Sequence, residues 1–163
     1  MEGLSLLKYC MPCRAKCCKM GGELIGSPIL DVKETALIKE KELLKEITSL
    51  SGNSYFIIRD DEKTRKCSFL GEDNKCRIQK MKPLDCLCYP IKAVYDKGKI
   101  KFIIDAECPA AKHLDKEFIK HAKRAALKSI KRFDRETYEH WLEKYIGWVG
   151  KTGVDLEEFV KKY

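Results

Sequence analysis

Nine cysteines in three groups constrain this chain of 163 residues more than any other feature. The groups are Cys10, Cys13, Cys17 and Cys18; then Cys67, Cys76, Cys86 and Cys88; and finally Cys108. An odd count and the adjacent pair Cys17–Cys18 suit disulfide pairing poorly. The first residues contain no apolar run of the length that an export signal needs, so we expect a cytoplasmic protein. Grouped thiols in a reducing cytosol are usually metal ligands or redox groups, and the sequence therefore predicts metal binding.

The composition is that of a folded protein, with 44% hydrophobic and 36% charged residues. A chain of this length fits one domain and can bury its own core. We expect a single domain over residues 1–163, in which residues 1–110 bind metal and residues 111–163 form a helical extension. No stretch reaches the length of a membrane-spanning helix, so we expect no membrane association.

The local patterns predict an α+β fold, in which a small antiparallel sheet with cysteine-rich metal-binding loops packs beside a C-terminal set of helices. Asp31 and Glu34 resemble a capping box, which predicts a helix from Val32 to about Ser49. Apolar runs on either side of the turn at residues 96–99 predict a hairpin. The other expected elements are strands at residues 55–58 and 67–70, and helices at about 114–133, 135–148 and 155–163.

The first cysteine group has the spacing of a metal site. Cys10 and Cys13 are separated by two residues, so both can point at one ion from a tight turn. Arg14, Lys16 and Lys19 lie among these cysteines. Their positive charge favours thiolate over thiol, and thiolate is the form that binds metal.

The later cysteines lie in short motifs: Cys67-Ser68-Phe69-Leu70, Cys76-Arg77-Ile78, the stretch from Pro83 to Tyr89-Pro90, and Cys108-Pro109. With the first group, they make the chain resemble the YkgJ-type cysteine-cluster family, described as a zinc- or iron-chelating domain (CxxCxxCC), over residues 10 to about 110. The resemblance implies eight metal ligands: Cys10, Cys13, Cys17, Cys18, Cys67, Cys76, Cys86 and Cys108.

The chain departs from the family pattern at four positions. Lys82 and Leu87 stand where the family usually has arginine, and Ala110 stands where it usually has glycine. Cys88 is additional to the pattern. Because free cysteine is often buried as a small apolar residue, we interpret Cys88 as a core residue or spare thiol rather than a ligand.

Eight thiolates suffice for two four-coordinate sites, or for one site plus structural cysteines. Zinc and iron–sulfur clusters both accept ligation by cysteine alone. The three histidines, His113, His121 and His140, lie beyond the pattern. Zinc sites often include histidine, so an all-cysteine set favours an iron–sulfur cluster, of which 4Fe-4S is our preferred type, with zinc as the alternative. The cysteine pattern also resembles that of flagellin lysine methylases, which are associated with an iron–sulfur cluster. This resemblance likewise implies an iron–sulfur cluster.

Residues 112–135 contain nine Lys or Arg and three acidic residues, and so supply most of the formal net charge of +8. Apolar residues recur there at helical spacing. We interpret this segment as a solvated helix face, and hold open a binding face for an unidentified acidic protein or, less favoured, nucleic acid. We interpret the nearby aromatic residues as the buried stripe of a helix: Tyr138, Trp141, Tyr145 and Trp148.

The sequence thus favours a metal-binding protein in a structural, electron-transfer or metal-delivery role. One alternative is a protein-modifying enzyme related to flagellin lysine methylases. Against it, no Gly-rich cofactor loop follows a predicted strand, and no nucleophile–base set is apparent. Another alternative is a zinc-stabilised nucleic-acid-binding protein.

Overall fold

The computed structural model describes residues 13–19, 26–146 and 153–163. Its strands form two three-stranded antiparallel sheets, of order β1-β3-β2 and β4-β5-β6. The first sheet contains β1 (Ile29–Leu30), β2 (Leu44–Thr48) and β3 (Ser54–Ile58), and the second contains β4 (Ile91–Asp96), β5 (Lys99–Asp105) and β6 (Gly153–Asp155). The expected α+β class is confirmed, with two sheets among the described residues where the sequence predicted one.

The longer helices follow the second sheet in the chain, as expected. The α-helices are α2 (Val32–Leu37), α3 (Leu84–Cys88), α4 (Lys116–Ile130), α5 (Arg135–Trp141) and α6 (Leu156–Lys162). A π-helical turn, η5 (Leu142–Ile146), continues α5. Short 3-10 helices are η1 (Lys16–Lys19), η2 (Lys41–Leu43), η3 (Gln79–Met81) and η4 (Ala111–His113).

The predicted long helix from Val32 to Ser49 is wrong. Asp31 and Glu34 do form both hydrogen bonds of a capping box, so the helix begins where it was expected. It ends after six residues at Ile38, whose backbone is extended and whose side chain is buried. Residues 44–48 then pair with β3 in the register Leu44↔Ile58. Pairing with the next strand of a hairpin therefore overrides the helical preference of this lysine- and glutamate-rich segment.

The predicted strand at residues 67–70 is also absent. Two isolated bridges, Asp60↔Cys67 and Leu70↔Cys76, hold this segment as a folded loop. The predicted hairpin is confirmed as β4 and β5, which pair from Ile91↔Ile104 to Asp96↔Lys99. The helices predicted at about 114–133 and 155–163 are confirmed as α4 and α6, with ends shifted by one to three residues. The helix predicted at 135–148 begins at Arg135 as α5 and continues as the π-helical η5 to Ile146, and its last two residues lie outside the described residues.

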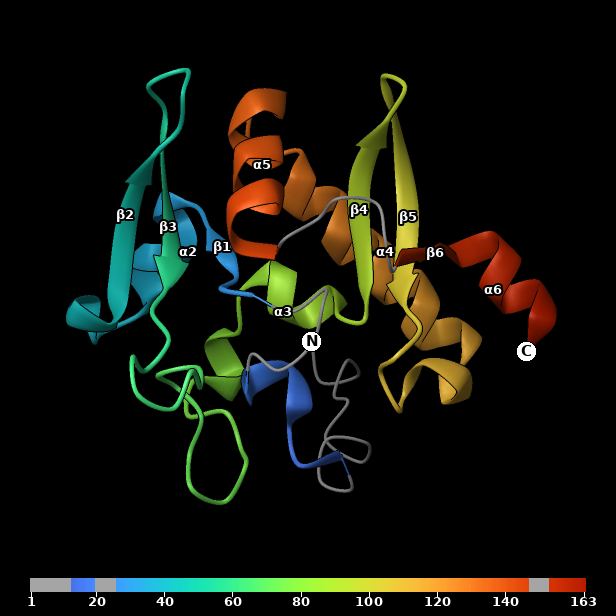
Figure 1. Cartoon of the computed structure of the whole chain (residues 1–163), viewed down its shortest axis with the longest axis horizontal. Coiled ribbons are helices and arrows are strands. Elements are labelled where there is room, and N and C mark those ends of the chain that lie inside the picture. Colours follow the sequence, from blue (N-terminus) through green and yellow to red (C-terminus); the bar gives the residue numbers. More distant parts are fainter. Residues whose placement is uncertain (1–12, 20–25, 147–152) are drawn as a thin grey trace.

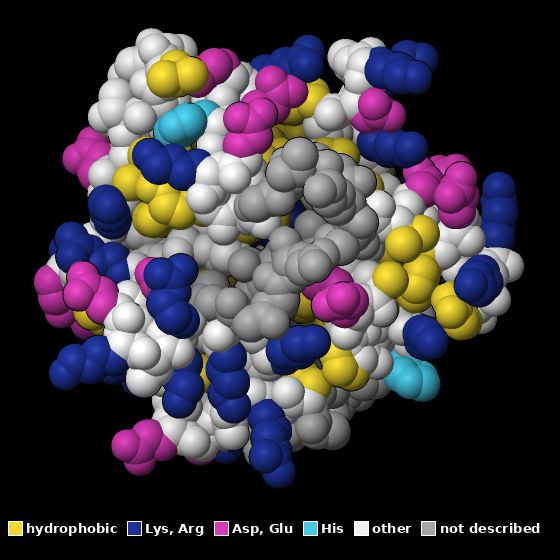
Figure 2. All heavy atoms as spheres, viewed as in Figure 1, with side chains coloured by type: hydrophobic (Ala, Val, Ile, Leu, Met, Phe, Trp, Pro, Cys, Tyr) yellow, Lys and Arg dark blue, Asp and Glu magenta, His cyan; other side chains and the backbone are white. Residues whose placement is uncertain are grey.

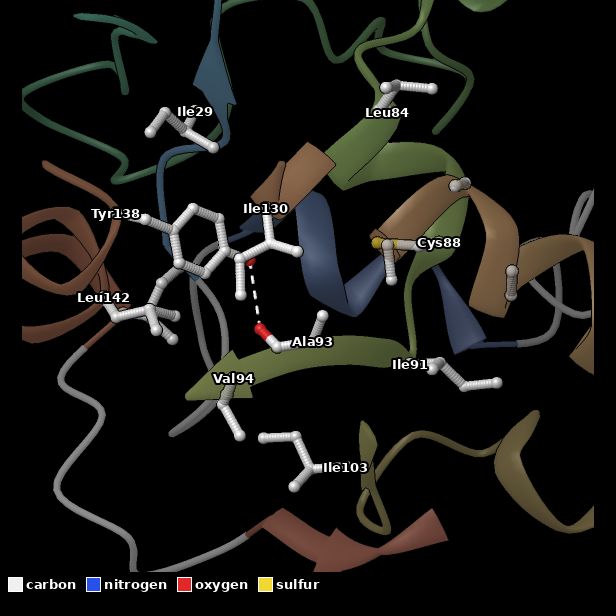
Figure 3. Packing of buried hydrophobic residues seen from close by; sticks show 14 of the residues in the cluster. Ile29, Leu84, Cys88, Ile91, Ala93, Val94, Ile103, Ile130, Tyr138 and Leu142 are labelled. Carbon is white, nitrogen blue, oxygen red and sulfur yellow. Dashed lines mark hydrogen bonds between the residues drawn. The ribbon is translucent and has the colours of Figure 1, made fainter. Parts of the chain in front are cut away.

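A large apolar core lies among the second sheet, the helices α3 to α6 and one side of the first sheet. Figure 1 shows α5 standing between the two hairpins, with α3 crossing below it. Tyr138 and Trp141 of α5 are buried here, as the aromatic-stripe interpretation expects, and the Tyr138 hydroxyl donates to the Ala93 carbonyl at 3.1 Å (Figure 3). Tyr145 is half-buried, and Trp148 lies outside the described residues.

A second, smaller core lies under the first sheet. Phe69 and Ile78, from the cysteine-bearing loops, pack here against Leu30 and Ile58. Phe69 is fully buried. The loops that carry Cys67 and Cys76 are thus anchored to the sheet by apolar side chains as well as by backbone bridges.

Candidate metal centre

Cys17 and Cys18 lie side by side in η1, at the end of the segment that carries the first cysteine group. Two residues with positive φ, Arg14 and Ala15, turn the chain just before them. The Cys18 amide closes this turn by donating to the Ala15 carbonyl at 2.9 Å. The two sulfur atoms are 4.0 Å apart, so the bent backbone directs adjacent side chains toward one region.

Backbone hydrogen bonds join this turn to the second cysteine group. The Cys67 amide donates to the Cys18 carbonyl at 2.7 Å. Cys76 follows on the other side of the loop, paired with Leu70. Figure 1 shows η1 beside these loops at the lower edge of the molecule.

Helix α3 brings Cys86 to the same region. The helix begins after Pro83. Proline suits the start of a helix because amide hydrogens there have no acceptor within the helix, and proline has none to satisfy. The Leu84 amide donates at 2.7 Å to Oε1 of Glu34, and Arg132 lies 3.2 Å from the same oxygen. The first turn of α3 is therefore fixed to α2 and to the segment that follows α4.

Five of the predicted ligands line one cavity of about 80 Å³. They are Cys17, Cys18, Cys67, Cys76 and Cys86. Lys82, Tyr89, Asp85 and Lys92 line the same cavity, together with apolar residues such as Phe69 and Ile78. A water needs roughly 10–15 Å³ of such space, so the cavity is large enough for a small polyatomic group.

Four of these thiols interact electrostatically with one another. The pKa of Cys67 is raised to about 12, chiefly by burial and further by Cys18 and Cys76. Burial is also the main cause of the raised pKa values of Cys76 and Cys86, and the Cys18 charge adds to both. Cys18 differs, since its neighbour Cys17 lowers its pKa to about 7 against the effect of burial, with help from Lys82. At neutral pH, Cys18 is therefore the thiol of this group most readily ionised, while the others are protonated. Metal binding at such a site would release protons from the remaining thiols.

A second set lies around Tyr89. Its hydroxyl donates to Oδ2 of the buried Asp105 at 2.7 Å. Cys108 adjoins this pair: burial raises its pKa, the Tyr89 hydroxyl lowers it, and Cys13 raises it. Cys17 in turn adds to the raised pKa of Tyr89, after burial and Cys108. Cys17 and Cys108 thus act on one tyrosine, and Cys13 acts on Cys108.

The other candidates have separate positions. Cys10 lies outside the described residues. Cys88 is 1% exposed in the main core (Figure 3). Its sulfur donates to the Asp85 carbonyl at 3.2 Å. Cys88 is therefore a core residue, as interpreted from the sequence. None of the three histidines lines the cysteine cavity.

The thiols surround a space rather than meeting at a point. Among the described residues, no three side chains of the metal-binding types lie close enough to hold a single ion. The donor set is nevertheless the soft, all-sulfur set that iron–sulfur clusters and zinc accept. None of the eight described cysteines is withdrawn from ligation by a disulfide. The residues present therefore fit a thiolate-held metal centre.

Sequence reasoning missed three side chains of this site. Lys82 appeared only as a departure from a family pattern, yet its charge lowers the pKa of Cys18 and Cys76. Asp85 and Lys92 form a buried ion pair at 2.7 Å beside the cavity. An isolated aspartate and lysine seven positions apart gave no signal, because their pairing depends on how α3 meets β4.

Positive charge surrounds the loops that carry these thiols. Figure 2 shows Lys and Arg side chains gathered over the lower left of the face, where Figure 1 places the loops from residue 59 to residue 82. Exposed cations of these loops and of η1 include Arg14, Lys16, Lys66, Arg77 and Lys80. Their positive charge partly offsets the net negative charge of a metal centre that is held by thiolates.

Comparison with known proteins identifies the family. A family model described as "CxxCxxCC: Putative zinc- or iron-chelating domain" matches residues 9–109. The chain belongs to this family. The matched segment contains every cysteine that lines the cavity. No curated protein and no solved structure matches the chain.

None of the helices in the described part of the chain combines the length and apolar composition needed to cross a membrane.

Proposed function

We propose that this protein holds an iron–sulfur cluster, 4Fe-4S in preference to other types, through its clustered cysteines. The supporting observation is that five thiols line one cavity of about 80 Å³ while no three ligand side chains among the described residues gather about a single point. A polyatomic centre needs such an arrangement, because each thiolate binds a different metal atom of the cluster. The role is structural, electron-carrying or metal-delivering, in the cytoplasm, where thiols remain reduced.

Zinc is the alternative, since four thiolates also suit a tetrahedral zinc site. Anaerobic purification followed by metal analysis and absorption spectroscopy separates the two. A brown protein with iron, sulfide and broad absorption in the visible supports the cluster. A colourless protein with stoichiometric zinc contradicts it.

We infer that the eight ligands divide into two sets of four. Cys18, Cys67, Cys76 and Cys86 influence one another's ionisation, which supports one shared centre. Cys17 and Cys108 influence the ionisation of Tyr89, Cys13 influences that of Cys108, and Cys10 completes this second set by its spacing from Cys13. On this division, Cys76→Ser and Cys108→Ser each remove metal from one centre and leave the other loaded. Loss of all metal from either variant contradicts the division into two centres.

We further propose that α4 docks an acidic protein partner. Four exposed cations, Lys116, Lys120, Arg124 and Lys128, recur every fourth residue, and none has an ion-pair partner within the described chain. Cations at this spacing repel each other, and those near the N-terminus also oppose the helix dipole. An acidic helix with carboxylates every four residues matches their repeat of about 6 Å.

The α4 proposal is tested with polyglutamate and a DNA duplex as probes. We expect polyglutamate to bind, and Lys120→Glu with Arg124→Glu to abolish that binding. Lys97→Glu with Lys99→Glu, at the exposed hairpin turn, is the matched control. Tighter binding of DNA than of polyglutamate favours the nucleic-acid alternative and contradicts the proposal. The enzyme alternative has its own test, since it requires binding of S-adenosylmethionine.

A further inference from the structure

Helix α3 carries two cysteines that compete for one position. Cys86 lines the cysteine cavity, and Cys88 lies in the apolar core. Two residues along an α-helix are about 200° apart around its axis, so only one of these side chains can face the cavity at a time. Since α3 is only five residues long, its own hydrogen bonds do little to fix its rotation.

A buried ion pair fixes the side of α3 that carries Cys88. Asp85 Oδ1 lies 2.7 Å from Nζ of Lys92 on β4, and each side chain is only 5% exposed. The Lys92 ammonium also lies 5.0 Å from the centre of the Trp141 ring. Asp85 and Cys88 are three residues apart and so occupy neighbouring positions on the surface of the helix, with Asp85 at the border of the cavity.

A pair of this kind is better suited to selecting a conformation than to adding stability. Desolvation of the two charges offsets most of their attraction, whereas separating them leaves a buried charge uncompensated. If α3 rotated to bring Cys88 into the cavity, Asp85 would leave Lys92 alone against the Trp141 ring. The rotated arrangement is therefore disfavoured, because it would leave the Lys92 charge buried without a partner.

We propose that the Asp85–Lys92 ion pair is a positioning device that selects Cys86, and not Cys88, as the cysteine that α3 presents to the metal centre. The inference deepens the proposed function and rests on it for the metal. Its structural part, the rotation of α3, is independent of metal. Lys92 lies outside the cysteine motifs of the sequence, and Asp85 is a residue of the Pro83–Pro90 motif other than its cysteines.

The test measures which thiol is accessible in the metal-free protein. Iodoacetamide labelling with peptide mass spectrometry gives the ratio of Cys88 to Cys86 modification. In the wild type we expect a low ratio, because Cys86 is half-buried beside a cavity and Cys88 is 1% exposed. In Asp85→Leu with Lys92→Met, which replaces the pair by apolar side chains, we expect a folded protein in which the ratio rises several-fold.

A matched control exists in the same hairpin. Asp96 and Lys101 form an exposed pair, with 3.9 Å between their charged atoms and about half of each side chain in solvent. Asp96→Leu with Lys101→Met should leave the ratio at the wild-type value. Should the buried double variant not fold, Asp85→Asn replaces only the charge and should still raise the ratio.

An unchanged ratio in a folded Asp85→Leu/Lys92→Met variant, or in folded Asp85→Asn, overturns the inference. Metal provides a second readout: Cys86→Ser should lower metal content in the wild-type background and have a smaller effect in the double variant, where Cys88 can replace it. A wild type that never contains metal overturns the proposed function. The labelling ratio is measured without metal, so the two failures are distinguishable.

Discussion

The amide of Cys67 donates a hydrogen bond to the carbonyl of Cys18 at 2.7 Å, which joins two cysteine groups that are distant in the sequence. Both side chains line the same cavity. Because the hydrogen bond uses only backbone atoms, it does not depend on either thiol. The main chain therefore helps to bring the two cysteine groups together independently of their sulfur atoms.

Cys86 and Cys88 provide a matched pair of substitutions. Cys86→Ala should lower metal content, since it removes a thiol from the cavity. Cys88→Ala should retain the metal and reduce the free energy of unfolding of the metal-free protein by about 1 kcal/mol, as expected for a small core truncation. Metal analysis and chemical denaturation measure the two effects. Equal loss of metal from both variants would contradict the assignment of Cys88 to the core.

The low pKa of Cys18 predicts an order of thiol reactivity. At pH 7, with the metal removed, about half of the Cys18 side chains should be thiolate, whereas Cys67, with a pKa of about 12, should remain protonated. Iodoacetamide should therefore label Cys18 first and Cys67 much more slowly. The order of labelled peptides in mass spectrometry checks this, and earlier labelling of Cys67 is the opposing result.

Lys82 should contribute to that reactivity. Its positive charge lowers the pKa of Cys18, so Lys82→Met should raise the pKa and slow Cys18 labelling at pH 7. The exposed Lys80 is the control, because Lys80→Met removes the same charge from a residue that does not line the cavity. Equal labelling rates in the two variants would show that Lys82 acts only through net charge.

The carboxylate of Glu34 should couple α2 to the metal site. Glu34→Ala leaves the Leu84 amide without its acceptor and should reduce the free energy of unfolding by about 1–3 kcal/mol. Because the same bond fixes the start of α3, metal should also be held more weakly in competition with a chelator. Glu42→Ala, at an exposed position in η2, should change neither quantity. A destabilised variant with unchanged metal affinity would show that Glu34 does not influence the metal site.

Asp134 predicts an acid-dependent loss of stability. Its carboxylate accepts from the amide and hydroxyl of Thr137, which lowers its pKa below the ordinary value of 3.8. Stability from this cap is therefore fully present above about pH 4 and is lost as pH falls through the folded-state pKa. Asp134→Ala should cost about 1 kcal/mol at pH 7 and less at low pH. Asp134→Asn, which keeps an uncharged acceptor, should show a weaker pH dependence in chemical denaturation.

Local signals in the sequence identified the parts of the fold that depend on neighbouring residues. The capping box at Asp31 and the hairpin around residues 96–99 were predicted because their chemistry lies within a few positions. The segment from Leu44 to Thr48 was misassigned, since its strand exists through pairing with β3. The cysteines were found from spacing alone. Which of them share a cavity could not be predicted, because α3, η1 and the loops meet only in the folded chain.

The most direct test of the account is the metal content of the folded, anaerobically prepared protein, measured by native mass spectrometry on the wild type and on Cys67→Ser. The account predicts stoichiometric metal in the wild type and a reduced amount in the variant, which keeps the backbone hydrogen bond between residues 18 and 67. A fully folded wild type that contains no metal after preparation and reconstitution with iron, sulfide or zinc would contradict it.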